Sequence, residues 1–420
     1  MTRRTTDVEK SRLIPSRLRR PGDDPIFALN AEATARRAKG ESIVNATVGS
    51  LLKDDGALAV LPTAARAVKE VGAVDWAGYA PIAGTPAFLK AVVEDAFTGR
   101  PRLRDAATAV ATPGGSGALR HAVSTFLEPG QSLLTTSYYW NPYATIADEQ
   151  ERKVSTFRMF SRDGHLDVVA LDAALERSLA EQGRALLLLN DPCQNPTGYS
   201  MSDRDWVGVV EVLDRHAGSG PVVVVLDAAY SAYSPGDGLR RPLAALEPLA
   251  DRVLLLTAWT ASKTFTHYGL RVGALVAVVP DAKERAEVAA ALTYACRGTW
   301  SNCNRGGMAA VTRLLTDPAM RADVDREREG FVALLMERVA AFNAAAGAAR
   351  LPYPRYDGGF FTTVFAADAP AAAAAMRREG VYVVPIEGAL RLGLCSVAKA
   401  DVPRLVDSVA RALKGTRAGA

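Results

Sequence analysis

The middle of the chain carries a series of short apolar runs that constrain the fold more than any other feature. Each run has the length and the two-sided hydrophobicity of a strand buried in a parallel sheet. The runs are Ser132–Thr136, Ala185–Leu189, Val222–Leu226, Val253–Thr257 and Ala274–Val279. The segment Ser202–His216 has apolar residues at helical spacing and joins two of the runs, which favours a right-handed crossover. The pattern predicts an α/β fold with a mostly parallel sheet flanked by helices.

After about Asp317 the alternation of runs and helices gives way to a different pattern. A long charged helix is expected from Arg321 to Phe342. Short strands are expected after it, near Phe360–Phe365, Val381–Val384 and Leu390–Leu394. This mixture predicts a second, smaller α+β domain.

The N-terminal stretch to about Gly56 has no comparable set of strands, so we expect it to pack with the small domain. Its first twenty residues hold seven basic side chains but no interleaved aromatic residues. We interpret them as an arm that is solvated or embraces a partner, rather than as a nucleic-acid-binding arm. The predicted parts are residues 1–56 as N-terminal arm and part of the small domain, 57–317 as large domain and 318–420 as C-terminal small domain.

Composition excludes several functional classes. The chain has 420 residues, and its 50 basic and 46 acidic residues almost balance, so no polyelectrolyte surface for nucleic acid is indicated. The four cysteines are scattered, which favours neither a disulfide framework nor a zinc cluster. No stretch reaches the roughly 20 apolar residues of a membrane span. No signal-peptide core begins the chain. We expect a cytoplasmic protein with no membrane partner.

Lys263 follows the small-residue turn Thr260-Ala261-Ser262 and precedes Arg271 by eight positions. A lysine forms a useful Schiff base only if part of its population is neutral, which requires a desolvated or cationic neighbourhood. Arg271 could supply that charge while binding a phosphate. Taken alone, however, a lysine is most often a solvated surface charge.

Polar residues follow three of the predicted strands at the point where each strand ends. These segments are Asn190–Asn195, Asp227–Tyr230 and Thr260–Lys263. In open α/β sheets, ligands bind beyond the carboxyl ends of the strands. The sequence therefore predicts that the three strand ends converge on one site.

A glycine-rich segment, Gly114–Gly117, opens the amphipathic run Ala118–Leu127. Free backbone N–H groups at a helix start, together with the hydroxyl of Ser116, would suit an anion such as phosphate. A tight turn without a ligand is the alternative reading of such a loop.

Eight stretches, in this order and spacing, resemble the fold-type I pyridoxal phosphate enzymes of the class I/II aminotransferase family. The resemblance covers nearly the whole chain and is nearest to the aspartate and aromatic aminotransferases. The stretches are Asn45–Gly49, Tyr79–Gly84, Gly114–Arg120, Asn195–Gly198, Asp227–Tyr230, Thr260–Gly273, Arg297–Asn302 and Arg391. The resemblance implies pyridoxal 5'-phosphate as cofactor, amino acids and 2-oxo acids as substrates, and a homodimer.

The resemblance also implies which residues hold the cofactor phosphate. Gly115, Ser116, Thr260 and Arg271 would bind it, and Tyr79 would reach it from the other subunit of the dimer. Lys263 would hold the cofactor aldehyde as a Schiff base.

The cofactor ring would contact a second group of residues. Asp227 would pair with the ring nitrogen, although an Asp that caps a following turn is a common alternative. Tyr230 and Asn195 resemble the pair that hydrogen-bonds the phenolic oxygen. Tyr139 falls where the family stacks an aromatic side chain on the ring, and Trp140 is a close second.

Arg391 lies in an otherwise apolar predicted strand, where a substrate α-carboxylate could pair with it in bidentate fashion. An internal salt bridge with Asp or Glu is the alternative. Arg297 matches the arginine that in the family enters the neighbouring active site and meets a side-chain carboxylate. By resemblance, Gly49, Asn195 and Phe360 would also line the substrate pocket.

The chain also departs from the family pattern. Thr260 replaces a usual glycine or serine, Gly114 replaces a serine often seen in the phosphate loop, and Tyr139 replaces the tryptophan of typical aspartate aminotransferases. These departures put dedicated aspartate specificity in doubt. His267 we interpret as a packed wall residue rather than an acid or base.

The predicted function is ping-pong transfer of an amino group from a dicarboxylic or aromatic L-amino acid to a 2-oxo acid, with Lys263, Asp227 and Tyr230 as catalytic residues. A β-lyase or a specialised biosynthetic pyridoxal phosphate enzyme on the same fold is the main alternative. A non-catalytic regulatory module is a remote one.

Overall fold

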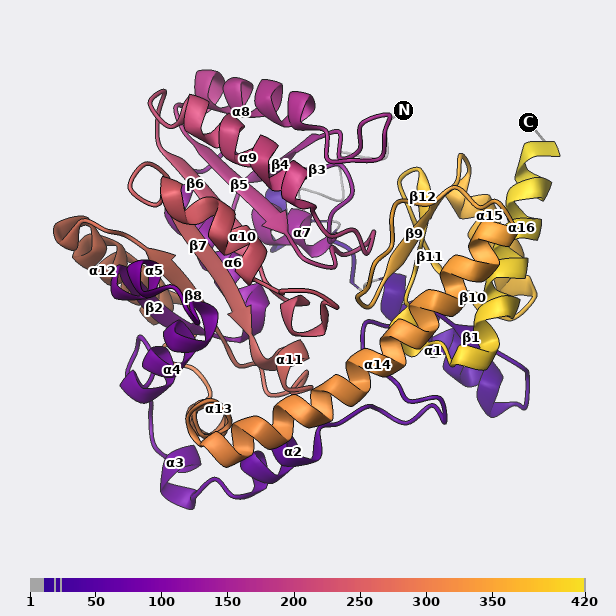
Figure 1. Cartoon of the computed structure of the whole chain (residues 1–420), viewed down its shortest axis with the longest axis horizontal. Coiled ribbons are helices and arrows are strands. Elements are labelled where there is room, and N and C mark those ends of the chain that lie inside the picture. Colours follow the sequence, from indigo (N-terminus) through magenta and orange to yellow (C-terminus); the bar gives the residue numbers. More distant parts are fainter. Residues whose placement is uncertain (1–10, 19, 23–24, 419–420) are drawn as a thin grey trace.

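The largest sheet of the molecule forms from the apolar runs (Figure 1). The structure, a computed structural model, describes residues 11–418 with the exception of residues 19, 23 and 24. Within these residues the sheet has seven strands in the order β2-β8-β7-β6-β5-β3-β4. They are β2 (Ala107–Thr112), β3 (Ser132–Thr136), β4 (Lys153–Phe157), β5 (Ala185–Asn190), β6 (Val222–Asp227), β7 (Leu254–Thr260) and β8 (Gly273–Val278). The prediction of a mostly parallel α/β sheet is confirmed.

Strand β8 is the exception to the parallel arrangement, because it runs antiparallel to both β2 and β7. The prediction of Ala274–Val279 as a parallel strand is therefore wrong in direction. The connection from Thr260 to Gly273 contains the four-residue helix α11 (Ala261–Thr264), and Thr260 and Gly273 are register partners. A parallel return needs a crossover that carries the chain back along the whole strand, whereas this connection ends beside the residue where it began.

Helices pack on both faces of the sheet, which explains why its strands are continuously apolar. Besides α11, the α-helices between β1 and β8 are α2 (Pro62–Lys69), α3 (Ala73–Ala77), α4 (Pro86–Ala96), α5 (Pro101–Asp105), α6 (Gly114–Phe126), α7 (Pro142–Glu149), α8 (Val168–Gln182), α9 (Asp203–His216) and α10 (Arg240–Leu246). Helix α9 confirms the predicted segment Ser202–His216, and Ser202 caps it in a reciprocal capping box with Asp205.

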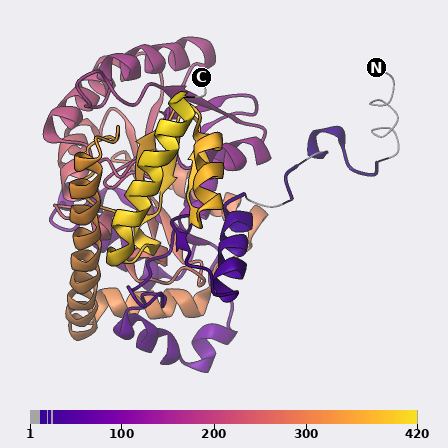
Figure 2. The same cartoon turned by 90° about the vertical axis from the view of Figure 1, so that its right-hand side faces the viewer.

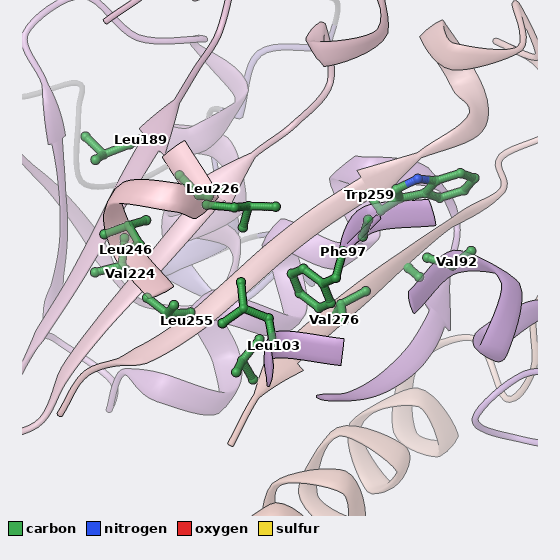
Figure 3. Packing of buried hydrophobic residues seen from close by; sticks show 14 of the residues in the cluster. Val92, Phe97, Leu103, Leu189, Val224, Leu226, Leu246, Leu255, Trp259 and Val276 are labelled. Carbon is green, nitrogen blue, oxygen red and sulfur yellow. The ribbon is translucent and has the colours of Figure 1, made fainter. Parts of the chain in front are cut away.

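One face of the sheet packs against Phe97, at the end of α4, and against Leu103 of α5. Figure 3 shows Phe97 and Leu103 pointing at strand residues such as Leu255 and Val276. A second buried cluster on α6, α7 and α12 (Ala282–Thr299) includes Leu119, which packs with residues of the same strands. The sheet is thus packed against buried side chains on both faces.

The two ends of the chain build a smaller unit together. Its strands are β1 (Val44–Asn45), β9 (Thr362–Phe365), β10 (Val381–Tyr382), β11 (Val384–Ile386) and β12 (Ala389–Leu392). Strand β1 pairs in parallel with β10, and β11, β12 and β9 form an antiparallel sheet. Figure 2 shows α1 (Pro25–Ala38) near α15 (Ala369–Arg378) and α16 (Val402–Ala418). The two domain boundaries drawn from the sequence, after residues 56 and 317, stay predictions.

Helix α14 (Pro318–Ala348) connects the two units and extends the predicted helix Arg321–Phe342 at both ends. It follows α13 (Arg305–Thr316) and runs along the molecule to the small unit (Figure 1). By length and composition alone it passes the test for a membrane span, with a mean hydropathy of 1.3 over its most apolar window. Arg338, however, is fully buried in the protein and donates to the carbonyl oxygens of Leu394 and Cys395, so this part of α14 packs in the small unit's core.

The predicted basic N-terminal arm is described only in part. Arg3, Arg4, Lys10 and Arg19 lie outside the described residues. Arg17 pairs with Glu149, and Arg20 pairs with Asp148, at the C-terminal end of α7. Cations at a helix C-terminus are favourable because they offset its partial negative charge.

Candidate active site

The carboxyl ends of β5, β6 and β7 meet at one cavity, because these strands are neighbours in the sheet. Their last residues are Asn190, Asp227 and Thr260, and all three line the cavity. Its volume is about 550 Å³, which is within the usual range for small-molecule sites. The small unit closes the opposite side with Thr47–Ser50 and Arg391.

Lys263 lies in the short helix α11, which begins because the side chain of Thr260 accepts a hydrogen bond from the Ser262 N–H. Its Nζ donates to the Gly49 carbonyl at 2.9 Å and lies 4.6 Å from the ring centroid of Tyr268. Burial lowers the pKa of Lys263 to about 8, with smaller effects from nearby charges. The neutral form, which nucleophilic chemistry requires, is therefore far more populated near neutral pH than for an ordinary lysine.

Asp227 is buried at the end of β6. Its Oδ2 accepts a hydrogen bond from the Tyr143 hydroxyl at 2.6 Å, and its Oδ1 accepts one from the Ala229 N–H at 3.2 Å. Burial raises the pKa of Asp227, while these two hydrogen bonds and Lys263 act in the opposite direction. Sequence reasoning missed Tyr143, because nothing in its local pattern links it to an aspartate 84 positions away.

Asn195 and Tyr230 lie together beside Asp227, as the resemblance implied. The Asn195 side-chain amide donates to the Tyr230 hydroxyl at 3.2 Å, and the Asn195 N–H donates to Asn190 Oδ1 at 2.7 Å. The side-chain oxygen of Asn195 is buried and has no hydrogen-bond partner among the described residues. Because the O and N of an amide can be exchanged, this position offers either an acceptor or a donor to a ligand.

The predicted phosphate loop forms the N-terminal turn of α6. Gly114 has a φ of 72°, and a Cβ there would lie 2.6 Å from Arg271 Nη2, so this position needs glycine. Arg271 Nη1 donates to the hydroxyl of Ser262 at 3.1 Å and to the Tyr268 carbonyl at 3.0 Å. Ser262 was not assigned from the sequence, although it lies in the lysine segment.

The loop and its neighbours form a cradle for an anion. The residues that line the cavity include Gly115, Ser116, Thr260, Ser262 and Arg271. A Cβ on Gly115 would lie 3.5 Å from the Thr260 Cβ. The helix start and the guanidinium together provide the charge that a phosphate needs.

Arg391 lies on β12 at the opposite side of the cavity and is buried. Its Nη2 donates to the Thr47 carbonyl at 2.7 Å, and its guanidinium lies 4.7 Å from the ring centroid of Phe361. Gly49 lies against the same ring, since a Cβ there would be 3.1 Å from Phe361 Cζ. The lack of a side chain at Gly49 makes room for the Phe361 ring, and both Phe361 and Arg391 line the cavity.

At two predicted aromatic positions the neighbouring residue lines the cavity, and the roles of Tyr139 and Phe360 stay predictions. Trp140 lines the cavity, whereas Tyr139 is absent from the described lining and stacks on Tyr143 with a centroid distance of 6.2 Å. Likewise Phe361 lines the cavity, while Phe360 is fully buried behind it. Neighbouring aromatic residues look alike in sequence, and only the backbone direction decides which of them faces the ligand.

Tyr79 and Arg297 do not line the cavity of this chain as described. The side chain of Tyr79 is 89% exposed. Arg297 is exposed at the end of α12 and donates to the hydroxyl of Ser301 at 2.7 Å. Both assignments required a second subunit and stay predictions. His267 is buried with its Nε2 3.2 Å from the Ala64 carbonyl, which agrees with its interpretation as a wall residue.

Comparison with known proteins gives a consistent answer. A family model described as aminotransferase class I and II matches residues 41–409. The chain is 27% identical to an aromatic-amino-acid aminotransferase of Paracoccus denitrificans over 340 residues, which are 79% of this chain and 82% of that protein. It is 33% identical to an aromatic-amino-acid aminotransferase of Pseudomonas aeruginosa over 232 residues, or 54% of this chain and about half (56%) of that relative.

Solved structures agree with these sequence relatives. The crystal structure of an aminotransferase from Anaerococcus prevotii has a TM-score of 0.91 and 29% identity, and the match covers 96% of this chain and 99% of that one. An aromatic-amino-acid aminotransferase from Burkholderia pseudomallei, covalently bound to pyridoxal phosphate, shares the fold with a TM-score of 0.78 at 23% identity, over 95% of this chain and 99% of that one.

Proposed function

Because this chain belongs to the class I and II aminotransferase family, we propose which of its residues carry out the reaction. The enzyme uses pyridoxal phosphate to transfer an amino group between an amino acid and a 2-oxo acid. The observation that carries the assignment of residues is the convergence of Lys263, Asp227 and Arg391 on one cavity.

The cavity has the groups that pyridoxal phosphate needs. Gly115, Ser116, Thr260 and Arg271, together with Ser262, would hold the phosphate. Asp227 would pair with the ring nitrogen. Trp140 would stack on the ring in place of Tyr139. The unpartnered side-chain amide position of Asn195 and the hydroxyl of Tyr230 would meet the phenolic oxygen. When bound, the cofactor supplies an aldehyde that condenses with amines and a ring that withdraws electrons from the substrate α-carbon.

Lys263 is the proposed proton carrier. The Lys263 amine faces the cavity and has a pKa of about 8. It can therefore accept the proton from the substrate α-carbon and return a proton to the cofactor carbon. Burial raises the pKa of Asp227, its two hydrogen bonds oppose that rise, and as an anion it would hold a proton on the ring nitrogen. Tyr143 orients that carboxylate.

Arg391 is proposed to bind the substrate α-carboxylate with Gly49 at its side. A buried guanidinium on a strand is a favourable bidentate partner for a carboxylate. We propose further that the enzyme is a cytoplasmic homodimer, in which Tyr79 and Arg297 of a second copy complete the site. Their exposure in a single chain supports this arrangement. The predicted domain limits at 56 and 317 belong to the same proposal.

The test uses the purified, cofactor-loaded enzyme and single amino acids without any 2-oxo acid. Visible absorbance of the bound cofactor should bleach when an amino donor converts it to its amine form. Glutamate, aspartate and an aromatic amino acid would be compared to identify the donor class. An unbleached band, with pyruvate released from a β-substituted donor, would instead show a β-lyase and overturn the proposal.

A further inference from the structure

The short segment that carries Lys263 is held at both of its ends from outside the active-site cavity. Before the lysine, Trp259 of β7 donates from its indole Nε1 to Asp95 Oδ2 of α4 at 2.9 Å. After the lysine, the Thr264 carbonyl accepts from Arg328 Nη1 at 3.1 Å, where α14 passes α11 (Figure 1). In the described part of the chain, neither Asp95 nor Arg328 lines the cavity. Both groups therefore contact the segment from behind.

These two contacts belong to one continuous ion network. Asp95 Oδ1 accepts from Arg321 Nη1 at 2.7 Å, and Arg321 Nε donates to Asp325 Oδ2 at 2.8 Å. The other carboxylate oxygen of Asp325 accepts from Arg328 Nη2. The three residues of α14 follow one another at spacings of four and three positions, so they lie on one face of the helix. A single face of α14 thus connects both ends of the lysine segment.

Arg328 is the most buried of the charged residues that α14 gives to this network. Its side chain is 11% exposed, against 36% for Arg321 and 37% for Asp325. Helix α11 has only four residues, so its last carbonyls lack partners within the helix. The Arg328 guanidinium satisfies the Thr264 carbonyl in a charge-assisted hydrogen bond, which solvent screens weakly at this depth. Removing Arg328 would therefore release the C-terminal end of the lysine segment.

The network acts on the location of the Lys263 amine rather than on its charge. Burial is the main cause that lowers the pKa of Lys263, and the neighbouring groups that also act on it are Cys395, Arg271, Asp227 and Arg391. None of these groups belongs to the network. In the proposed function the amine must reach both the substrate α-carbon and a cofactor carbon, and a misplacement of about 1 Å can cost about 10²-fold in rate.

We propose that Arg328 is a positioning residue for Lys263, which acts through the Thr264 carbonyl and is itself aligned by Asp325. The contact between Asp95 and Trp259 is the second anchor of the same segment. This inference rests on the proposed function, in which Lys263 carries the proton. It predicts that breaking the network slows proton transfer without weakening the binding of the substrate.

The test compares Arg328→Ala with Arg326→Ala in the cofactor-loaded enzyme. Arg326 is a matched control, because it lies on the same helix and pairs with Asp323 three positions before it, but its side chain is 72% exposed. In Arg328→Ala, kcat should fall about 10- to 100-fold while KM changes less than about twofold. The rate of bleaching by an α-deuterated amino donor should show a larger isotope effect than in wild type, because proton transfer becomes the slow step. Arg328→Lys keeps a charged donor and should recover most of the loss.

Hydrogen exchange of the same loaded enzymes provides a readout that does not depend on turnover. The Phe265 and Thr266 N–H groups close α11 by donating to the carbonyls of Ala261 and Lys263, both at 3.0 Å. Their exchange should be at least about tenfold faster in Arg328→Ala, the scale of one lost hydrogen bond to a charged group, and unchanged in Arg326→Ala.

A second variant tests the other anchor in case Arg328→Ala does not fold. Trp259→Phe removes only the indole N–H and keeps an aromatic ring beside Phe88. We expect a smaller loss of kcat, about three- to tenfold, with the same rise in the isotope effect.

The inference is overturned if both variants keep the isotope effect and the exchange rates of wild type. It is equally overturned if kcat, KM and cofactor affinity all worsen together with no change in the isotope effect, because that pattern indicates general damage to the structure. Failure of the wild-type enzyme to bleach with any amino acid would instead overturn the proposed function itself. Normal bleaching of wild type with an unaltered isotope effect in Arg328→Ala and Trp259→Phe would remove only the role of the network.

Discussion

The two sides of the cavity are assembled in different ways. On the sheet side, Asn190, Asp227 and Thr260 end adjacent strands, and hydrogen bonds within the sheet fix their spacing. On the other side, Thr47 and Arg391 meet across 344 positions of sequence, in a unit built from both chain ends. In the proposed function the sheet side holds the cofactor, and the side built from the small unit binds the substrate. Substitutions should therefore separate cofactor binding from substrate binding according to the side they affect.

The largest effect is expected on the sheet side, for Lys263→Ala. The variant should fold and hold the cofactor noncovalently, but its kcat should fall about 10⁴-fold because the proton carrier is gone. Borohydride reduction followed by mass spectrometry should no longer show a covalent adduct. Lys90→Ala, at an exposed lysine on α4, provides the control. Near wild-type turnover in Lys263→Ala would refute the assignment.

Asp227→Ala should lower both the affinity for the cofactor and kcat. Loss of the buried carboxylate removes the partner of the ring nitrogen, and we expect a 10²- to 10³-fold lower kcat, roughly the cost of losing one preorganised electrostatic group. Cofactor affinity, measured by fluorescence titration, should fall as well. Unchanged values for both quantities would contradict the role of Asp227.

The stability of the cofactor-free protein should depend on pH through Lys263. Its pKa is lowered from 10.5 to about 8 on folding, so below pH 8 the folded state carries a charge that burial disfavours. As pH rises from about 8 to 10.5, the unfolded chain binds more protons than the folded one, and stability should increase by on the order of 3 kcal/mol. Urea unfolding of wild type and Lys263→Met at several pH values isolates this contribution. If the difference in unfolding free energy between the two proteins did not change with pH, this contribution of Lys263 would be contradicted.

Arg391→Lys probes the substrate side. A lysine keeps the charge but loses the planar fork, so we expect KM for every amino donor to rise about 10- to 100-fold. Cofactor affinity should stay unchanged, because Arg391 lies across the cavity from Asp227. A loss of cofactor affinity in this variant would break the division between the two sides.

Tyr143→Phe should give the smallest change and refine the sheet side. The ring keeps its packing, but Asp227 loses its 2.6 Å hydrogen bond while the Ala229 N–H still donates. We expect about tenfold weaker cofactor binding, at the lower end for a hydrogen bond to a charged group. The nitrogen chemical shift of ¹⁵N-labelled cofactor should move towards that of a neutral ring. An unchanged shift and affinity would remove Tyr143 from the site.

The sequence predicted the sheet side better than the substrate side, for physical reasons. The apolar runs and the polar residues at their ends are local patterns, so the convergence at Asp227 and Lys263 could be expected. Strand β2, Ala107–Thr112, was not predicted because its residues are small and weakly apolar. The direction of β8 was predicted wrongly because the connection before the strand, rather than the strand's own residues, determines that direction.

The substrate side depends on contacts that local patterns do not contain. Nothing in Ile26 and Phe27 indicates that they face a cavity, since their position follows from how α1 packs on β10 and on Asn45. The choice between Phe360 and Phe361 depends on the backbone where the chain enters β9. The assignment of Arg391 relied on the family resemblance, because its neighbour Thr47 is remote in sequence.

The pairing of β1 with β10 has a consequence for the order of assembly during protein synthesis. Val44 has Val381 as its register partner, in a chain of 420 residues. A ribosome completes the strands of the large sheet long before it reaches β10 and β12. Strand β1 therefore has no partner strand until β10 has been synthesised. The sheet side of the cavity can therefore form first, and the opposite side is completed only after β10 and β12 have been synthesised.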